Sequence, residues 1–520
     1  MTTQLTRIDF DKETGIGPEE QEGKFDAEEQ KFMEDLQGNI LKSHGRDHSR
    51  HLFIRFTPGK AEAGRQWLKA MSLKVTSAKA QWDLSAKRAK IFADARRQPD
   101  PEAYLSLELA TNASPPFIGL MLSFKGYETL GYATPSADPS FKAGTRSEAT
   151  YKKLGDPLPS AWEEGFRKDL HALVIIADDS PDVVKAMATT IREGVEKGIS
   201  PCGTVAHEEI GKVLRLRPDG PVREHFGFAD GVSEPLFLTK DIKKAKDGEG
   251  TSRWNPAAPL KLILAKDPVA PQEEPFAHAG NGMTGYGTYV VYRKLEQDLA
   301  RFNRQRLLLA QELAKADGRK KTHQGDLELA GAYMVGRFRD GTPVGEPATA
   351  HGVDDPIPND FDYLHDKKGA LCPFQAHTRK TNPRGDTVWQ FGAKLEDERL
   401  IRITRRAISY EQKTATGEKK VGLLFLCAQR DIAKQFEFMQ QSWCNNVDFV
   451  VGGKEGEPKT GQDPVVGQGH LEPAPRWPKK YGVPGSTFAN GIAESVTMRG
   501  GEYFFVPSIP FLKNADTVAR

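Results

Sequence analysis

The sequence predicts an α+β protein made of two halves. With 520 residues the chain is long for a single domain, so two domains are expected. Short apolar segments of strand type alternate with helical segments, but the strands are few and widely spaced. Residues 238–275 are rich in Lys, Asp, Glu and Pro, and are expected to be an exposed insertion or linker. Two similar α+β halves agree with this pattern, although the sequence has no repeat of fixed period.

In the first half, residues 1–35 are polar and acid-rich, and we expect a loose arm there. Three apolar segments have the composition of strands: Arg50–Phe56, Pro116–Leu122 and His171–Ala177. Residues 182–197 have helical spacing, and Gly198 follows as a helix C-cap. This half is therefore predicted to alternate strands with helices.

The second half begins with a predicted strand at Thr288–Arg293 and a long helix from about Leu295 to Ala316. Two later strands are predicted at Val421–Cys427 and Glu502–Pro507. A helix is predicted at Asp431–Trp443. The remaining long stretches, residues 340–372 and 452–485, have the Gly and Pro content of loops.

Composition and charge make several classes of function unlikely for this chain. The formal net charge is +2, so no overall field attracts nucleic acid or an acidic membrane. No segment approaches the ~20 apolar residues that cross a bilayer, and the N-terminus lacks the pattern of a secretory signal. The 4 cysteines have neither zinc spacing nor the density of a disulfide framework. A reducing, cytoplasmic location is therefore expected.

The segment Phe226–Pro235, FGFADGVSEP, is the first candidate for a functional site. It places Asp230 between Gly227 and Gly231, beside two phenylalanines. Glycine lets a flat ligand approach the backbone closely, and apolar surroundings raise the pKa of a carboxylate toward neutrality. Asp230 is therefore a candidate acid–base residue that faces something large and flat. A surface Asp-Gly turn is the alternative interpretation.

Residues 280–285, GNGMTG, match the glycine pattern of dinucleotide-binding sites. That pattern binds pyrophosphate only where it follows a strand and begins a helix. Here it follows a Pro-rich loop and precedes a strand, so nucleotide binding is not expected.

Two further segments contain candidate ligands. In Cys372–Arg384, CPFQAHTRKTNPR, His377 is followed by several cations. A neutral imidazole is a good ligand for haem iron, and cations nearby can pair with haem propionates. The alternative is an ordinary histidine beside a solvated basic turn. In Arg402–Tyr410, the pair Arg405 and Arg406 would by itself be an ordinary surface feature of a strand.

Together these segments resemble the dye-decolourising peroxidase family. The family's Gly-x-x-Asp-Gly motif, haem-ligand segment and distal arginine segment are similar to Gly227–Gly231, Cys372–Arg384 and Ile403–Tyr410. Ala407 and Ser409 stand where the family usually has Gly and Pro, but Arg405 is kept. Further family landmarks follow in the family's order at Leu36–Leu41, Met334–Arg337, Gln429–Ile432 and Gly500–Ser508. The length resembles the larger bacterial and fungal branch.

The resemblance implies a fold of two ferredoxin-like α+β halves, antiparallel sheets with packed helices. It implies a polar arm at 1–35, an N-terminal ferredoxin-like domain at 36–237, an insertion at 238–275 and a C-terminal ferredoxin-like haem-binding domain at 276–520. The Gly-x-x-Asp-Gly motif falls in the N-terminal domain. One haem b (iron protoporphyrin IX) per chain would be held mainly by the C-terminal half.

The resemblance also implies roles for single residues. His377 would be the axial ligand of the haem iron on the proximal side, with Asp431 as the carboxylate behind it or Glu437 as the alternative. On the distal side, Asp230 would move the peroxide proton, itself or through a water, and Arg405 would stabilise negative charge. Haem contacts are expected from Arg384, Arg379, Phe228, Gly231 and Phe425.

The implied activity is that of a haem peroxidase, which reduces hydrogen peroxide and oxidises dyes, phenols or other small-molecule reductants through a ferryl intermediate. Bulky dyes cannot reach a buried iron, so Tyr410 is the expected electron relay, with Trp389 and Trp477 as weaker candidates. Nucleic acid and membranes are not expected partners. The physiological reductant, Mn(II) use and the choice between monomer and dimer stay open.

Three other interpretations compete with this one. Arg223 and His225 would suit a plant-type peroxidase with a distal His and Arg, but the rest of that pattern is absent. A haem-binding or haem-processing protein with only secondary peroxidase activity would use the same haem site. A non-haem interaction module would require every family match to be accidental.

Overall fold

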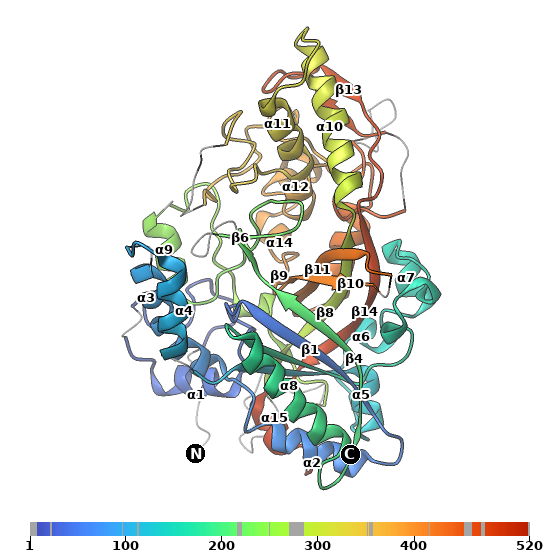
Figure 1. The fold of residues 1–520 in the computed structure, drawn as a ribbon. Coiled ribbons are helices and arrows are strands. Elements are labelled where there is room, and N and C mark those ends of the chain that lie inside the picture. Colours follow the sequence, from blue (N-terminus) through green and yellow to red (C-terminus); the bar gives the residue numbers. More distant parts are fainter. Residues whose placement is uncertain are drawn as a thin grey trace.

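A computed structural model of the chain describes residues 8–517 except 21–22, 96, 112–113, 216–220, 249, 270–284, 351, 353–356, 415, 452–459 and 470–473. A curved sheet forms the centre of the molecule, and helices surround it (Figure 1). None of the helices in the described part of the chain combines the length and the apolar content that crossing a membrane requires.

Four antiparallel strands form the N-terminal half of the sheet: β1 (His48–Phe56), β2 (Phe117–Ser123), β3 (Ala172–Asp178) and β4 (Gly203–Lys212). They lie in the order β2-β3-β1-β4. The predicted strands near 50–56, 116–122 and 171–177 are confirmed as β1, β2 and β3. Strands β2 and β3 are buried along their whole length, which explains their continuous apolar sequence. Strand β4 was not predicted, because polar residues such as Glu208 and Glu209 interrupt its apolar pattern.

The C-terminal half of the sheet repeats this arrangement. Its main strands are β8 (Tyr286–Gln297), β10 (Ile408–Lys413), β11 (Lys419–Gln429) and β14 (Val496–Val506), in the order β10-β11-β8-β14. In each half the strands that come fourth, first, third and second along the chain lie side by side. This is the ferredoxin-like order, so the predicted fold of two ferredoxin-like halves is confirmed.

The two halves form one sheet of ten strands rather than two separate ones. Strand β2 pairs with β14, where Leu122 faces Phe505. The two edge strands of the sheet, β10 and β4, also lie against each other. Gly211 of β4 is so close to Ile408 of β10 that a Cβ added at this glycine would lie 2.6 Å from the Ile408 side chain. The sheet therefore curves into a barrel. The domain boundaries 36–237 and 276–520 stay a prediction, because this continuous sheet crosses them.

The longer helices are α2 (Ala61–Met71), α3 (Ala78–Ala95), α4 (Pro101–Thr111), α8 (Pro181–Glu196), α10 (Leu299–Ala316) and α11 (Gln324–Val335), of which α8 packs on β1, β3 and β4. In Figure 1, α2 and α8 lie at one end of the barrel, and α10 and α11 lie at the other. Helix α8 confirms the helix predicted at 182–197 and is capped by Ser180. Helix α10 begins after the predicted residue 295, because β8 continues to Gln297 and Asp298 caps the helix.

Shorter elements connect these parts. The short helices are α1 (Ala27–Asp35), α5 (Phe124–Thr129), α6 (Pro139–Ala143), α7 (Glu148–Leu154), α9 (Thr239–Gly248), α12 (His377–Thr381), α13 (Asp386–Phe391), α14 (Leu395–Arg399) and α15 (Ile509–Lys513). The short strands are β5 (Leu214–Arg215), β6 (Val222–Arg223), β7 (Ala265–Lys266), β9 (Thr404–Arg405), β12 (Arg476–Pro478) and β13 (Thr487–Ala489). The helix predicted at 431–443 is confirmed as two wide π-helical segments, Ala433–Glu437 and Met439–Cys444.

Two predictions about exposed segments are wrong. The expected loose arm contains α1, which is capped by Asp26 and buries Phe32 and Met33. The expected exposed insertion at 238–275 contains α9 and a buried apolar run at 262–265. In both segments charged residues dominate the composition, and they conceal a few apolar side chains that reach the core. The glycine pattern at 280–285 lies outside the described residues except for Gly285.

Candidate active site

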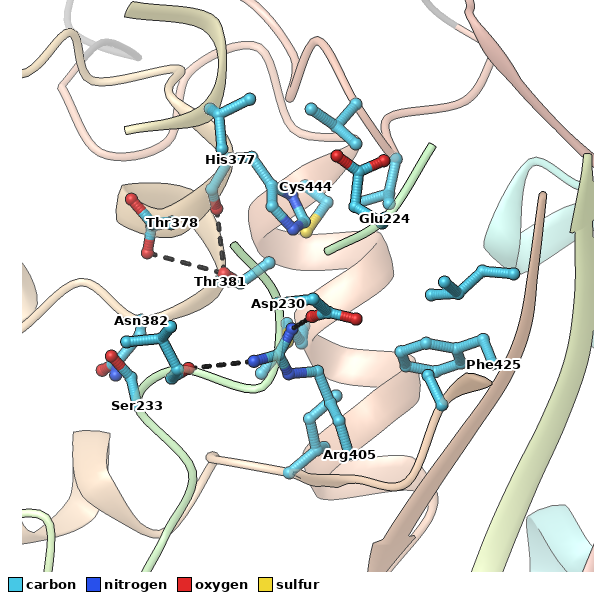
Figure 2. A pocket seen from close by; sticks show the side chains of 18 of the residues that line it. Glu224, Asp230, Ser233, His377, Thr378, Thr381, Asn382, Arg405, Phe425 and Cys444 are labelled. Carbon is cyan, nitrogen blue, oxygen red and sulfur yellow. Dashed lines mark hydrogen bonds and ion pairs between the residues drawn. The ribbon is translucent and has the colours of Figure 1, made fainter. Parts of the chain in front are cut away.

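A cavity of about 240 Å³ is lined mainly by residues of the C-terminal half, together with the segment 224–235. Asp230, His377 and Arg405 all line it, although they come from three distant segments of the chain. Figure 2 shows His377 on one side of this space and Asp230 with Arg405 on the other. We call the His377 side proximal and the Asp230 side distal.

The distal loop that carries Asp230 is held by its own backbone and by Glu224. Glu224 accepts hydrogen bonds from the backbone N–H groups of Phe226 and Phe228, at 2.7 and 2.9 Å. The backbone N–H of Asp230 donates to the carbonyl of Val222 at 2.9 Å. Gly227 has a φ of +95°, a conformation that glycine adopts at little cost. Burial raises the pKa of Glu224.

Asp230 and Arg405 form an ion pair in the cavity. Nη1 of Arg405 donates to Oδ1 of Asp230 at 3.0 Å, and Nη2 donates to the Val232 carbonyl at 2.9 Å. Strand β9 carries Arg405 and pairs with β11, where Arg405 faces Cys427. The predicted meeting of Asp230 and Arg405 is therefore present in the structure.

Glu234 is a distal residue that the sequence reasoning missed. Its Oε1 lies 2.7 Å from Nε of Arg405, and its Oε2 accepts the backbone N–H of Arg405 at 2.7 Å. Burial alone would lower the pKa of Arg405, but Glu234 and then Asp230 raise it above its ordinary value. The only available signal was a second carboxylate in the same motif, four residues after Asp230.

On the proximal side, Nδ1 of His377 lies 2.7 Å from Oδ2 of Asp463. The Asp463 side chain is fully buried, and its Oδ1 accepts the backbone N–H groups of Val465 and Val466 at 2.7 and 3.0 Å. This contact engages Nδ1 and leaves Nε2 as the ring nitrogen for a metal.

The prediction of Asp431 as the carboxylate behind His377 is wrong. Asp431 instead accepts the backbone N–H of Lys434 at 2.8 Å and caps the π-helical segment. The alternative, Glu437, accepts hydrogen bonds from Ser140 and Tyr503 at 2.8 and 3.0 Å. Asp463 was missed because it belongs to a loop 86 residues after His377, and no local pattern marks it.

Arg384 is a buried cation at the edge of the cavity, 2% exposed. Its guanidinium donates to the carbonyls of Asn359 and Phe361, both at 2.8 Å, and to the Ser233 hydroxyl at 2.9 Å. Among the described residues its hydrogen bonds all go to neutral oxygens. Burial, and then the neighbouring charge of Arg337, lower the pKa of Arg384 well below its ordinary value. A carboxylate from a ligand would therefore stabilise Arg384.

The prediction that Arg379 contacts a cofactor is wrong. Arg379 is fully buried and does not line the cavity. Its Nε donates to Asp386 at 2.7 Å, and its Nη1 donates to Asp366 at 3.0 Å. Its charge is thus satisfied inside the protein, and the sequence could not distinguish it from Arg384 a few positions later.

The apolar walls of the cavity agree in part with the prediction. Phe228 and Phe425 line the cavity, together with Val335, Leu423 and Met439. Gly231 was predicted to contact the cofactor but does not line the cavity. Its φ of +73° shapes the turn after Asp230 instead.

The predicted electron relays all lie outside the cavity lining. Tyr410 is 1% exposed, and its hydroxyl has no hydrogen-bond partner among the described residues. It packs with Leu424 and Leu426 in the barrel core, whereas their neighbours Leu423 and Phe425 face the cavity. The indoles of Trp389 and Trp477 donate to Asp386 and to the Asn490 carbonyl, at 2.9 and 3.1 Å.

Two other groups of described residues were candidates for a functional site, a distal histidine and a metal-binding cluster, and their contacts support neither role. His225, the candidate distal base of a plant-type enzyme, lies 3.0 Å from the Tyr410 carbonyl and does not line the cavity. The ligand atoms of Glu163, His207 and Glu209 lie within 4.8 Å of one another, as metal ligands do. The Lys294 ammonium lies 2.7 Å from both glutamates, so a protein cation already pairs with them.

The residues around the cavity fit a haem group. His377 offers Nε2 to a metal, and Arg384 offers to a carboxylate a buried cation whose hydrogen bonds, within the described part of the chain, go to neutral oxygens. Phe228 and Phe425 provide the apolar walls that a flat porphyrin requires. The acid–arginine pair on the distal side faces the place where a ligand of the metal would lie (Figure 2).

Protein-family models and known proteins match most of the chain. The "DyP dimeric alpha+beta barrel domain" model matches residues 35–215, and the "Dyp-type peroxidase, C-terminal" model matches residues 265–449. The "Multifunctional dye peroxidase DyP2" of Amycolatopsis sp. is 37% identical over 498 residues, which cover 93% of this chain and 96% of that protein. "Peroxidase 2" of Mycetinis scorodonius is 31% identical over 441 residues, 79% of each chain.

Solved structures agree with these matches. The crystal structure of a DyP-type peroxidase from Anabaena sp. is similar to this chain with a TM-score of 0.78 and 37% identity. The similarity covers 98% of this chain and 100% of that one.

Proposed function

This chain belongs to the dye-decolourising peroxidase family, and from that premise we propose that Asp230, Arg405 and His377 carry its peroxidase reaction. The enzyme is a peroxidase of the haem-dependent dye-decolourising family, and the names of its relatives indicate peroxide reduction and the oxidation of dyes. These relatives do not favour the haem-processing alternative. The observation that supports the residue roles best is a cavity with a carboxylate-backed histidine on one side and an acid–arginine pair on the other.

Haem, when bound, supplies the iron at which peroxide is reduced and the oxidising power that reductants consume. We propose one haem b per chain. His377 would hold the iron through Nε2, because its Nδ1 is engaged by Asp463. Arg384 would pair with a propionate. Phe228 and Phe425 would lie against the porphyrin.

Asp230 would accept the proton that hydrogen peroxide must lose and return it to the departing oxygen, itself or through a water. Its side chain lines the cavity and is 18% exposed. Arg405 would stabilise the negative charge that develops on the peroxide oxygens. Its raised pKa keeps the guanidinium charged throughout.

Asp463 would fix the orientation of the His377 ring and make the imidazole a stronger electron donor. Its two backbone N–H donors and full burial favour a carboxylate that stays in one place. An electron-rich axial imidazole favours O–O cleavage.

Larger reductants cannot enter the cavity, and Tyr410 stays the proposed relay for them. Tyr410 does not line the cavity, and within the described residues its hydroxyl has no hydrogen-bond acceptor to take its proton, which makes its oxidation harder. A cytoplasmic location also stays a proposal, supported by 4 cysteines that are all free and buried. Hydrogen peroxide and small-molecule reductants are the proposed partners.

The function is tested with protein produced in the presence of haem. We expect a Soret band, and peroxide-dependent oxidation of at least one member of a panel of dyes, phenols and Mn(II). A haem-loaded protein that oxidises none of these with peroxide would contradict the peroxidase function and leave the haem-binding alternative. The panel would also identify the class of reductant.

A further inference from the structure

Glu234 holds the distal arginine by two different groups at once. One carboxylate oxygen lies 2.7 Å from Nε of Arg405, and the other accepts the backbone N–H of the same residue at 2.7 Å. The Glu234 side chain is 17% exposed and lines the cavity. Asp230 binds only Nη1 of this guanidinium. One cation is thus shared by two carboxylates, and Glu234 makes the larger number of contacts.

We propose that Glu234 is the positioning residue of the distal site: it fixes Arg405 and balances its charge, so that Asp230 stays a competent proton acceptor. This inference rests on the proposed peroxidase function. A guanidinium paired with Asp230 alone would stabilise the Asp230 carboxylate and weaken it as a base. Sharing the guanidinium with Glu234 reduces that effect while keeping the charge that peroxide needs.

The charges around the pair are consistent with this role. Glu234 faces Arg405 and Arg406. Burial raises the pKa of the Cys427 thiol on the neighbouring strand, and the Glu234 charge adds to this effect. Asp230 faces Arg405 and, across the loop, Glu224. Glu224 is already occupied by two backbone N–H groups and by the Gln297 amide at 2.6 Å. Among the described residues, therefore, two carboxylates form ion pairs with Arg405: Asp230 and Glu234.

The test compares Glu234→Gln with the parent holoenzyme. Glutamine keeps the size of the side chain and an acceptor oxygen but removes the charge. The rate of the spectral change after mixing with peroxide is measured from pH 3 to 8, a range that spans ordinary carboxyl pKa values. Without the Glu234 charge, the Arg405 guanidinium is attracted to Asp230 alone. The acid limb of the profile should then move roughly 0.5–1 pH unit toward lower pH, and the plateau rate should fall several-fold.

Two further variants separate charge from shape. Glu234→Asp keeps the charge, so its acid limb should stay near that of the parent even if its plateau rate falls. Glu411→Gln is the matched control, because Glu411 is an exposed carboxylate on β10 that pairs with Lys419 at 2.9 Å. It should leave both the limb and the plateau unchanged.

Cyanide binding supplies a readout that needs no turnover. The anion occupies the distal side beside Arg405, and Glu234 both fixes that guanidinium and offsets its charge, so Glu234→Gln should change the affinity for cyanide several-fold from that of the parent. An acid limb and a cyanide affinity that both coincide with those of the parent would overturn the proposal. If the plateau rate falls but the acid limb of the pH profile stays where it is in the parent, Glu234 has only a structural role. That result would also overturn the proposal. A parent that does not react with peroxide would instead contradict the peroxidase function itself.

Discussion

On both the proximal and the distal side of the cavity, a nitrogen group is paired with a carboxylate. The carboxylates of the two sides differ in their exposure. The Asp463 side chain is fully buried and receives two backbone N–H groups. On the distal side, Arg405 is 33% exposed and Asp230 is 18% exposed. A buried, anchored carboxylate suits a ligand whose electronic character must stay constant. A partly exposed pair suits groups that must exchange protons and admit peroxide. The two sides are therefore expected to fail in different ways when they are altered.

The largest effect is expected from removing the proximal ligand. His377→Ala should lose the Soret band or bind haem weakly, because His377 is the only imidazole among the described residues that line the cavity. The absorbance spectrum after production with haem measures this. His365→Ala, at an exposed histidine on the same loop region, is the control and should keep the band. Full haem loading in His377→Ala would show that the iron ligand lies elsewhere.

Arg405→Leu should affect the other side alone. Haem binding should persist, while the rate of reaction with peroxide should fall about 10²–10³-fold, as expected for the loss of one preorganised charge-stabilising group. Rapid-mixing absorbance measures this rate. Arg405→Lys should lose less, because it keeps a positive charge without the fixed fork of donors. Equal rates for the parent and Arg405→Leu would remove Arg405 from the mechanism.

Asp463→Asn should have a smaller effect, roughly 10–100-fold on activity, because it perturbs the iron through His377 rather than directly. The Fe(III)/Fe(II) potential should become more positive, since a neutral partner makes the imidazole a weaker donor. Spectroelectrochemistry measures the potential. The matched change Asp431→Asn should leave the potential unchanged, because Asp431 caps a helix. A shift in the second variant and none in the first would reverse the assignment.

Tyr410→Phe is expected to have the smallest effect, because it touches neither side of the cavity. The free energy of unfolding should change by less than about 1 kcal/mol, since the lost hydroxyl has no partner among the described residues. The peroxide step should be unchanged. If Tyr410 is the relay, oxidation of bulky dyes should fall while oxidation of small phenols is kept. Steady-state rates for both classes measure this, and equal retention of both would exclude the relay.

The sequence predicted the elements that have a continuous apolar pattern, such as β2, β3 and α8, and the motif residues Asp230, His377 and Arg405 that meet in the cavity. It could not predict partners that depend on the path of a loop. Asp463 lies 86 residues after His377 in the sequence, and only the fold brings the two side chains together. Likewise, Arg379 and Arg384 look alike in sequence, and only their surroundings decide that one is neutralised internally.

Burial was also hard to predict where charged residues outnumber apolar ones. Helix α1 buries Phe32 and Met33 although the segment around it is acidic. Glu234 shows the same limit within the site. Its neighbours in sequence marked it as part of the motif, but its contact with Arg405 spans 171 residues of the chain.

The central claim is that Asp230 handles the peroxide proton while the proximal side stays intact. The most direct measurement is rapid mixing of haem-loaded Asp230→Asn with hydrogen peroxide, beside the parent at the same pH. Asparagine preserves the size of the side chain but cannot accept the proton, so the reaction should slow by about 10²–10⁴-fold while the Soret band before mixing matches that of the parent. A variant that carries haem and reacts with peroxide at the parental rate would contradict the account.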